Sequence, residues 1–88
     1  MEFRWNEWNV EHATQHGVRV EEIEALIEAA APPYPAEIGH RKWLVLGQGP
    51  TGRYLQAIYI VDDDDTLYVI HARPLRDHEK RRFRRRMR

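Results

Sequence analysis

The chain has 88 residues, which favours one domain that buries roughly 60–65% of its unfolded surface and excludes a deep cofactor cleft. It contains no cysteine, which excludes disulfides, thiolate zinc sites and a cysteine nucleophile. No apolar stretch approaches the ~18–20 residues of a membrane span, and no basic-then-apolar run marks a secretory signal, so a cytoplasmic protein is expected.

The net charge of zero conceals a polarised chain. From Arg73 to Arg88, nine Lys and Arg residues stand against two acidic residues, a net charge of +7. Residues 1–72 carry five basic and twelve acidic residues, a net charge of −7. Such asymmetry favours a polyanion as the partner of the basic end. The alternative is that the acidic part balances the basic part within the fold.

The N-terminal third predicts helices. Phe3-Arg4-Trp5 alternates apolar and polar residues, a pattern compatible with a short strand. Asn6 is a good helix N-cap and Gly17 a good helix end, so a helix is expected over residues 6–16.

A second helix is predicted by apolar residues at helical spacing, namely Val20, Ile23, Leu26, Ile27 and Ala30, with four glutamates (Glu21, Glu22, Glu24 and Glu28) on the rest of its surface. Prolines end it, and residues 31–41 are expected to form a loop.

The remainder predicts strands and a final helix. Residues 42–48, 54–61 and 66–73 are rich in apolar, aromatic and β-branched residues and are separated by turn residues. Pro74 ends the third strand, and Leu75, Glu79, Phe83 and Met87 line a helix through the basic segment. The expected fold is α+β: an antiparallel three-strand meander with helices on one face and the other face open.

The end of the third strand is the strongest candidate for chemistry. Because side chains alternate along a strand, His71 and Arg73 are expected on one face, with Val69 and Leu67 behind them. Histidine moves protons near neutral pH and arginine neutralises phosphate, so this pair suits a phosphodiester. The alternative is that Arg73 pairs with Glu79 and that His71 is a polar edge residue.

The order of short motifs resembles that of the BrnT toxins. Trp5, then His16-Gly17-Val18, then Glu21-Glu22, three strands and Ala72-Arg73 follow the family pattern, with Glu79 and Phe83 downstream. The chain departs from it at Asn6, Gln15, His71, Pro74 and Phe83. The resemblance implies a fold similar to the RelE ribonucleases, RNA cleavage without a metal or other cofactor, and a cognate antitoxin that joins the toxin in a hetero-oligomer.

A mechanism for such cleavage assigns roles to four residues. A base removes the proton of a ribose 2′-OH, an acid protonates the 5′ leaving oxygen, and fixed cations stabilise the charge on phosphorus. We assign His71 or Glu79 as base or acid, and Arg73 and Arg76 as the cations. The RNA-binding candidates are the other basic residues near this end, Arg53, Lys80, Arg81, Arg82, Arg84 and Arg85. Residues 84–88 are alternatively a frayed, solvated tail.

Other polar and aromatic clusters favour structural roles. His12 and His16 share a helix face, but a zinc site lacks a nearby third ligand, so no metal is expected. Asp62–Asp65 lacks calcium-loop spacing and is expected to be a solvated turn. The three tryptophans are expected in the core rather than stacked on bases. Two functions therefore stay open: a ribonuclease toxin, or a non-catalytic module that binds RNA or a partner.

Overall fold

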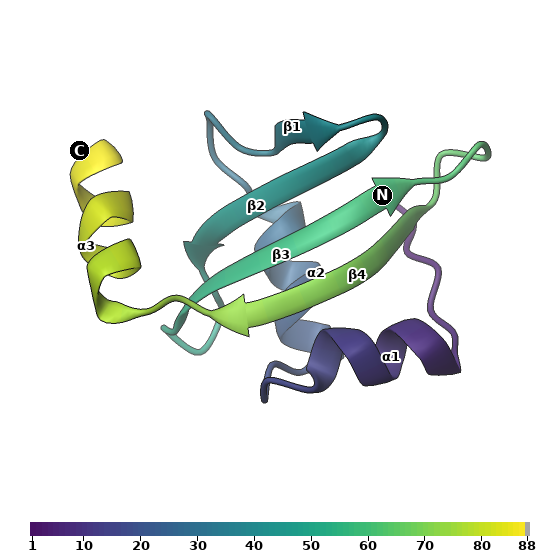
Figure 1. Cartoon of the computed structure of the whole chain (residues 1–88), viewed down its shortest axis with the longest axis horizontal. Helices are drawn as coiled ribbons and strands as arrows, with labels where there is room; N and C mark the ends of the chain where they lie inside the picture. The colour runs from purple at the N-terminus through teal and green to yellow at the C-terminus, as the bar shows by residue number, and fades with distance from the viewer. Residues whose placement is uncertain (88) are drawn as a thin grey trace.

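The computed structural model describes residues 1–87 and has an α+β fold. Seven elements follow one another along the chain, namely α1 (Glu7–Thr14), α2 (Val20–Glu28), β1 (Ala36–Gly39), β2 (Lys42–Gln48), β3 (Tyr54–Val61), β4 (Leu67–Pro74) and α3 (Asp77–Arg86). The four strands form one antiparallel sheet in the order β1-β2-β3-β4 (Figure 1). None of the helices within residues 1–87 is long and apolar enough to cross a membrane.

The sheet has one strand more than the meander expected from the sequence. Residues 31–41 were expected to be a loop, but Ala36–Gly39 forms β1 and pairs with β2. Hydrophobic pattern gave no sign of this strand because three of its four residues are exposed. It is a short edge strand whose stability comes from backbone pairing, and the charge of Glu37 discourages further pairing at that edge.

Helix α1 begins where the sequence predicts. The Asn6 side chain accepts a hydrogen bond from the Asn9 backbone N–H at 3.1 Å, and the Asn9 side chain accepts one from the Asn6 N–H at 2.7 Å. Gly17, with φ of +82°, turns the chain toward α2. The N-terminal strand is reduced to one parallel bridge between Phe3 and Leu67.

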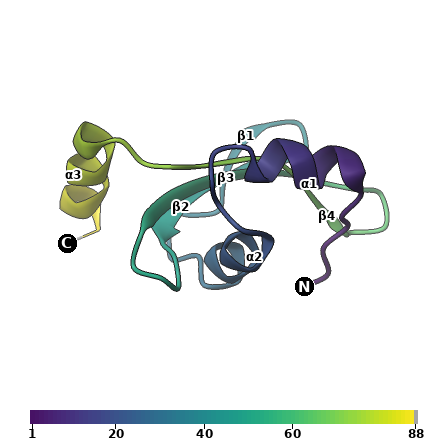
Figure 2. The same cartoon turned by 90° about the horizontal axis from the view of Figure 1, so that it is seen from below.

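The main core lies between α2 and one face of the sheet. Ile23, Leu26 and Ile27 of α2 are buried, as their spacing predicts, against inward-facing residues of the strands such as Val45 and Leu55. Figure 2 shows α2 beneath the sheet, α1 running beside β4, and α3 at the far end. The face of the sheet opposite α2 is therefore flanked by α1 only along its β4 edge.

Helix α3 is attached through a second, smaller cluster. Phe83 is buried and packs with Tyr34 and Leu75, and Met87 lies against the same cluster. Residues 84–86 continue the helix, and the Met87 N–H donates to the Phe83 carbonyl. Of the segment considered as a frayed tail, Arg88 lies outside the described residues. Arg84–Arg86 are thus held in helical geometry on an anchored element.

A buried carboxylate joins α2 to the β2–β3 hairpin. Glu22 is only 1% exposed, although the sequence placed it with the other glutamates on the polar side of α2. It accepts hydrogen bonds from Arg53 Nη2 at 2.7 Å, Thr51 Oγ1 at 2.9 Å and the Arg19 backbone N–H at 3.1 Å. The Arg53 hydrogen bond is the main cause that lowers the pKa of Glu22 to about 2.

We expect Glu22→Gln to lower the free energy of unfolding by ~2–3 kcal/mol at pH 7, because it leaves Arg53 without its charge partner. The exposed neighbour Glu21 is the control, and Glu21→Gln should change stability by less than ~0.5 kcal/mol. The pKa of Glu22 is lower in the folded chain than its ordinary 4.5. The stability that ionised Glu22 adds is therefore complete above pH 4.5 and is lost as the pH falls toward 2. Urea unfolding at pH 7 and pH 3 measures this. An equal loss of stability in the Glu22→Gln chain at both pH values would contradict it.

Candidate functional site

His71 and Arg73 lie on the same face of β4, as strand alternation predicts. Ala72 between them is fully buried in the core beside α2, whereas His71 and Arg73 are partly exposed. Both therefore point to the face opposite α2, where the end of α1 lies beside β4. Strand β4 ends at Pro74 and α3 begins at Asp77, so the pair lies close to the start of the basic helix (Figure 1).

The expectation that Leu67 and Val69 share this face was wrong. The register of β3 and β4 shifts between Ile58, which pairs with His71, and Tyr59, which pairs with Val69. Ile70 is the extra residue of a β-bulge, and a bulge reverses which residues face inward. Leu67 and Val69 are consequently in the core with Ala72, on the side opposite to His71.

Arg73 and Glu79 form a two-pronged ion pair. Nη1 of Arg73 lies 2.7 Å from Oε1 of Glu79, and Nη2 lies 2.7 Å from Oε2. The same two nitrogens donate to the Pro74 carbonyl at 3.1 Å and to Gln56 Oε1 at 3.3 Å. Four of the five guanidinium N–H groups thus have partners, and Nε–H keeps its donor capacity. The pairing that the sequence offered as the structural alternative is therefore present.

Glu79 also fixes the start of α3. Its Oε1 accepts the backbone N–H of Arg76, the N-cap residue, at 2.8 Å, while the Arg76 side chain is exposed. The hydrogen bond from Arg73, followed by that from Arg76, lowers the pKa of Glu79 to about 2. At neutral pH Glu79 is a carboxylate with little tendency to hold a proton. It is therefore poorly suited to act as acid or base.

The surroundings of His71 keep its imidazole neutral near pH 7. Burial lowers the pKa of His71 below its ordinary value, and the nearby His16 and Arg73 lower it further. The His16 and His71 rings meet edge to face, with centroids 5.8 Å apart. A neutral imidazole has a free nitrogen lone pair that accepts a proton. Of the candidate proton-transfer residues, His71 is the one in a suitable state to be the base.

Arg53 is held in place by the protein. Besides its bonds to Glu22, its Nη2 donates to the Gly17 carbonyl at 3.0 Å. Its side chain is 41% exposed, so one side of the guanidinium still faces solvent. Arg53 therefore lies next to His16–Gly17 in a fixed position.

The basic side chains of α3 are largely exposed. Arg81, Arg82, Arg84 and Arg85 are exposed and Lys80 is half-buried above the Tyr54 ring. Within residues 1–87, no carboxylate lies within ion-pair distance of these five side chains. The acidic part of the chain thus does not neutralise the basic helix by direct pairing.

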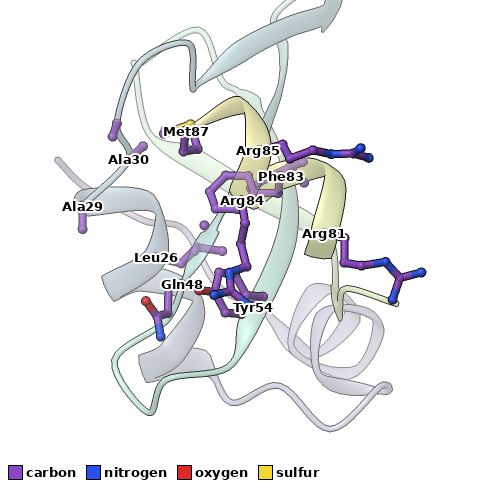
Figure 3. A pocket seen from close by; sticks show the side chains of 13 residues that line it. Leu26, Ala29, Ala30, Gln48, Tyr54, Arg81, Phe83, Arg84, Arg85 and Met87 are labelled. Carbon is purple, nitrogen blue, oxygen red and sulfur yellow. The ribbon is translucent and has the colours of Figure 1, made fainter. Parts of the chain in front are cut away.

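A groove of about 790 Å³ separates α3 from the end of the sheet. Apolar side chains from α2 and α3, including Leu26 and Phe83, line it together with Tyr54 of β3 (Figure 3). Arg81, Arg84 and Arg85 lie along its α3 side. The groove is therefore apolar within and positive along one wall.

The other sequence candidates have structural partners. His12 stacks on Trp8 with ring centroids 3.8 Å apart, and its Nδ1 is 2.7 Å from the Trp8 carbonyl. In the Asp62–Asp65 turn, Asp62 pairs with Arg4 at 2.7 Å. Over residues 1–87, no three His, Cys, Asp or Glu side chains are grouped as metal ligands.

The tryptophans divide between core and surface. Trp5 and Trp43 pack against the core, as expected, whereas Trp8 is 51% exposed and stacks near Tyr68. Trp8 was assigned to the core from residue type alone, and that was wrong. Its neighbours on α1, which include the exposed Val10, did not form an apolar stripe in the sequence, and this was the available signal.

Comparisons of the chain with models of protein families, with curated proteins and with solved structures find no match. The functional argument therefore depends on the residues and geometry described above.

We expect Glu79→Gln to lower the free energy of unfolding by ~1–2 kcal/mol at pH 7, because Arg73 loses its ionic partner. Asp77→Asn, in the same helical turn but outside the ion pair, should cost no more than ~0.5 kcal/mol. The pKa of Glu79 is lower in the folded chain than its ordinary 4.5, so the difference between wild type and Glu79→Gln should shrink as pH falls from 4.5 toward 2. Urea unfolding measures the stability, and amide exchange reports opening of the first turn of α3. Equal urea midpoints for Glu79→Gln and Asp77→Asn would show that the ion pair does not contribute to the stability of the fold.

Proposed function

We propose that this chain is an endoribonuclease of the toxin type, which cleaves RNA through the ribose 2′-OH without a metal. The observation that carries the proposal is the placement of a neutral imidazole, His71, beside Arg73 and next to a helix rich in unneutralised arginines. The resemblance of the sequence motifs to the BrnT toxins supports the same function, and so does the order of two helices, an antiparallel sheet and a basic helix.

The geometry sharpens the roles assigned from the sequence. His71 takes the proton of the 2′-OH, and the 2′ oxygen attacks phosphorus. Arg73 contributes its remaining donor, Nε–H, and its positive charge, while Glu79 holds its guanidinium in one orientation. Arg76 has an exposed side chain next to this pair and is available to a phosphate oxygen. Glu79 is thus a positioning residue rather than the acid or base.

The exposed basic residues of α3 are proposed to bind the RNA backbone. Non-specific phosphate contacts weaken with salt because counterions are released on binding. The helix brings Arg81, Arg84 and Arg85 to one side, along the groove.

The cognate antitoxin is proposed to occupy the groove between α3 and α2. The groove combines apolar walls with arginines, so its complement is a segment that carries apolar and acidic side chains together. Such a segment would neutralise the arginines that RNA needs, which explains inhibition without contact to His71.

The Arg73–Glu79 pair favours one other candidate function. Four of the five guanidinium N–H groups of Arg73 are hydrogen-bonded within the protein, as expected of an arginine with a purely structural role. The alternative is accordingly a non-catalytic module that binds RNA or a protein partner on the same scaffold. Activity measurements separate the two.

We expect induced expression of the wild-type chain to arrest bacterial growth and His71→Ala to abolish the arrest, with in vitro cleavage reduced ~10²–10³-fold. His12→Ala is the matched control and should arrest growth as wild type does. RNA with a 2′-deoxy residue at the cleavage position should resist cleavage, because the nucleophile is absent. Co-expression of a small antitoxin encoded by a neighbouring gene should restore growth.

Growth arrest by a folded His71→Ala chain would remove His71 from the mechanism. A wild-type chain that neither arrests growth nor cleaves RNA, in a preparation free of antitoxin, would favour the binding module.

RNA affinity should fall steeply as the salt concentration rises from about 50 to about 200 mM. The dependence on salt should become weaker when positive charges are removed from α3. For the triple variant Arg81→Gln/Arg84→Gln/Arg85→Gln, the slope of log K against log salt should decrease in magnitude by about 2. Arg19→Gln, which removes one exposed charge at the start of α2, should leave the slope unchanged. Fluorescence anisotropy with a labelled single-stranded RNA measures both. An identical slope for the triple variant and wild type would exclude α3 as the RNA contact.

A further inference from the structure

Two histidines far apart in the sequence meet beside Arg73. His16 follows the C-cap of α1 and is exposed, whereas His71 belongs to β4 and is half-buried. Their rings approach edge to face with centroids 5.8 Å apart and planes inclined by 66°. Within residues 1–87, neither ring has a side-chain hydrogen bond to another protein group, so both keep their ring nitrogens for a ligand.

The proposed reaction needs a second proton-transfer group. Attack by the 2′-OH requires a base, and departure of the 5′ oxygen requires an acid. Glu79 does not fill the second role, because Arg73 and the Arg76 backbone N–H bind its carboxylate. His16 is the other proton-transfer side chain placed against His71.

We propose that His16 and His71 form the acid–base pair of this site, with His71 as base and His16 as acid; this inference rests on the proposed ribonuclease function. The 2′-OH proton moves to a nitrogen of His71 as the bond between the 2′ oxygen and phosphorus forms. The bond from phosphorus to the 5′ oxygen then breaks, and protonated His16 gives its proton to that oxygen. The products are a 2′,3′-cyclic phosphate and a free 5′-hydroxyl.

The chain holds His16 in place. Gly17, with a positive φ, makes the turn that directly follows His16, and its carbonyl accepts a hydrogen bond from Arg53 at 3.0 Å. Arg53 is itself fixed by the buried Glu22. A hairpin side chain and a buried carboxylate thus determine where the end of α1 lies, and with it the position of His16.

The groups that face the two rings suit a phosphate. His71 is flanked by Arg73 on β4, and its partner on β3 is the uncharged Ile58. Arg53 of the hairpin lies beside the backbone that carries His16, with its charge shared with Glu22. The charged group that acts on His71 is thus a cation, Arg73, whose Nε–H is left for a ligand, and a cation favours an anionic substrate.

His12 provides a matched control on the same helix. It lies in α1, four residues before His16, but its ring is stacked on Trp8 and its Nδ1 contacts the Trp8 carbonyl. Its substitution removes a histidine from α1 without touching the pair. Effects that appear in His16 variants and not in His12→Ala therefore report on the pair.

The test compares wild type with His16→Ala, His16→Asn, His71→Ala and His12→Ala, each checked for folding by circular dichroism. Cleavage rates of a short RNA are measured from pH 5 to pH 9. A base must be deprotonated and an acid protonated, so wild type should give a bell-shaped profile. Both His16 variants should lose the alkaline limb with rates ~10²–10³-fold lower, and His71→Ala should lose the acidic limb. His12→Ala should keep the bell.

A modified substrate separates an acid from a structural residue. RNA with sulfur in place of the 5′ bridging oxygen has a leaving group that departs without a proton. This substrate should restore cleavage by His16→Ala and His16→Asn to within ~10-fold of wild type and leave His71→Ala impaired. A structural defect at His16 would slow both substrates equally.

Four results would overturn the pairing. His16 variants with a wild-type pH profile, or with no gain on the sulfur substrate, would refute His16 as the acid while leaving RNA cleavage established. Rescue of His71→Ala in place of His16→Ala would refute the assignment of the two roles. A wild-type chain that cleaves neither substrate would refute the pairing together with the proposed function.

Discussion

The ion pair of Arg73 and Glu79 is the interaction on which the candidate site depends. Both oxygens of the carboxylate and both terminal nitrogens of the guanidinium are used, at 2.7 Å each. Because a bidentate pair has one favourable geometry, it fixes the end of β4 relative to the first turn of α3. It also decides the chemistry, because a carboxylate bound in this way is no longer a proton carrier near neutral pH.

A second arginine–glutamate pair fixes the end of α1 relative to the β2–β3 hairpin. Glu22 holds Arg53, and Arg53 holds the Gly17 carbonyl at the end of α1. The two pairs differ in burial: the Glu22 side chain is 2% exposed, whereas that of Glu79 is 22% exposed. Substitution of Glu22 would therefore disturb the whole fold, while substitution of Glu79 acts mainly on α3. Between them the two pairs determine the positions of His16, His71 and the basic helix.

Sequence reasoning predicted the elements that have strong local signals. The N-cap at Asn6, the apolar face of α2 and the three long strands follow from propensity and periodicity, and the structure confirms them. Strand β1 was missed because its pairing with β2, not its composition, makes it a strand. The bulge at Ile70 was missed because an inserted residue leaves no trace in an alternating pattern of apolar residues.

The candidate site was predictable in part. Strand alternation correctly placed His71 and Arg73 together, since both lie on the same side of the bulge. No sequence pattern placed Glu22 in the interior, because its partners Thr51 and Arg53 come from a hairpin about thirty residues away. His16 was considered as a metal ligand and as part of the His16-Gly17-Val18 motif, and its approach to His71 depends on how α1 packs beside β4.

These ion pairs explain why the acidic and basic parts of the sequence do not neutralise each other in the folded chain. Glu22 and Glu79 each form an ion pair with an arginine and hold it at a fixed position, and Asp62 does the same for Arg4. The arginines of α3 are left without carboxylate partners over residues 1–87, so their field adds up along one helix. That helix is attached through one buried aromatic residue, Phe83, and through the Arg73–Glu79 pair. Helix α3 starts at Asp77, three residues after β4 ends at Pro74, so these arginines follow His71 and Arg73 closely in the chain. The neutral total charge of the chain therefore coexists with a strongly positive surface along α3.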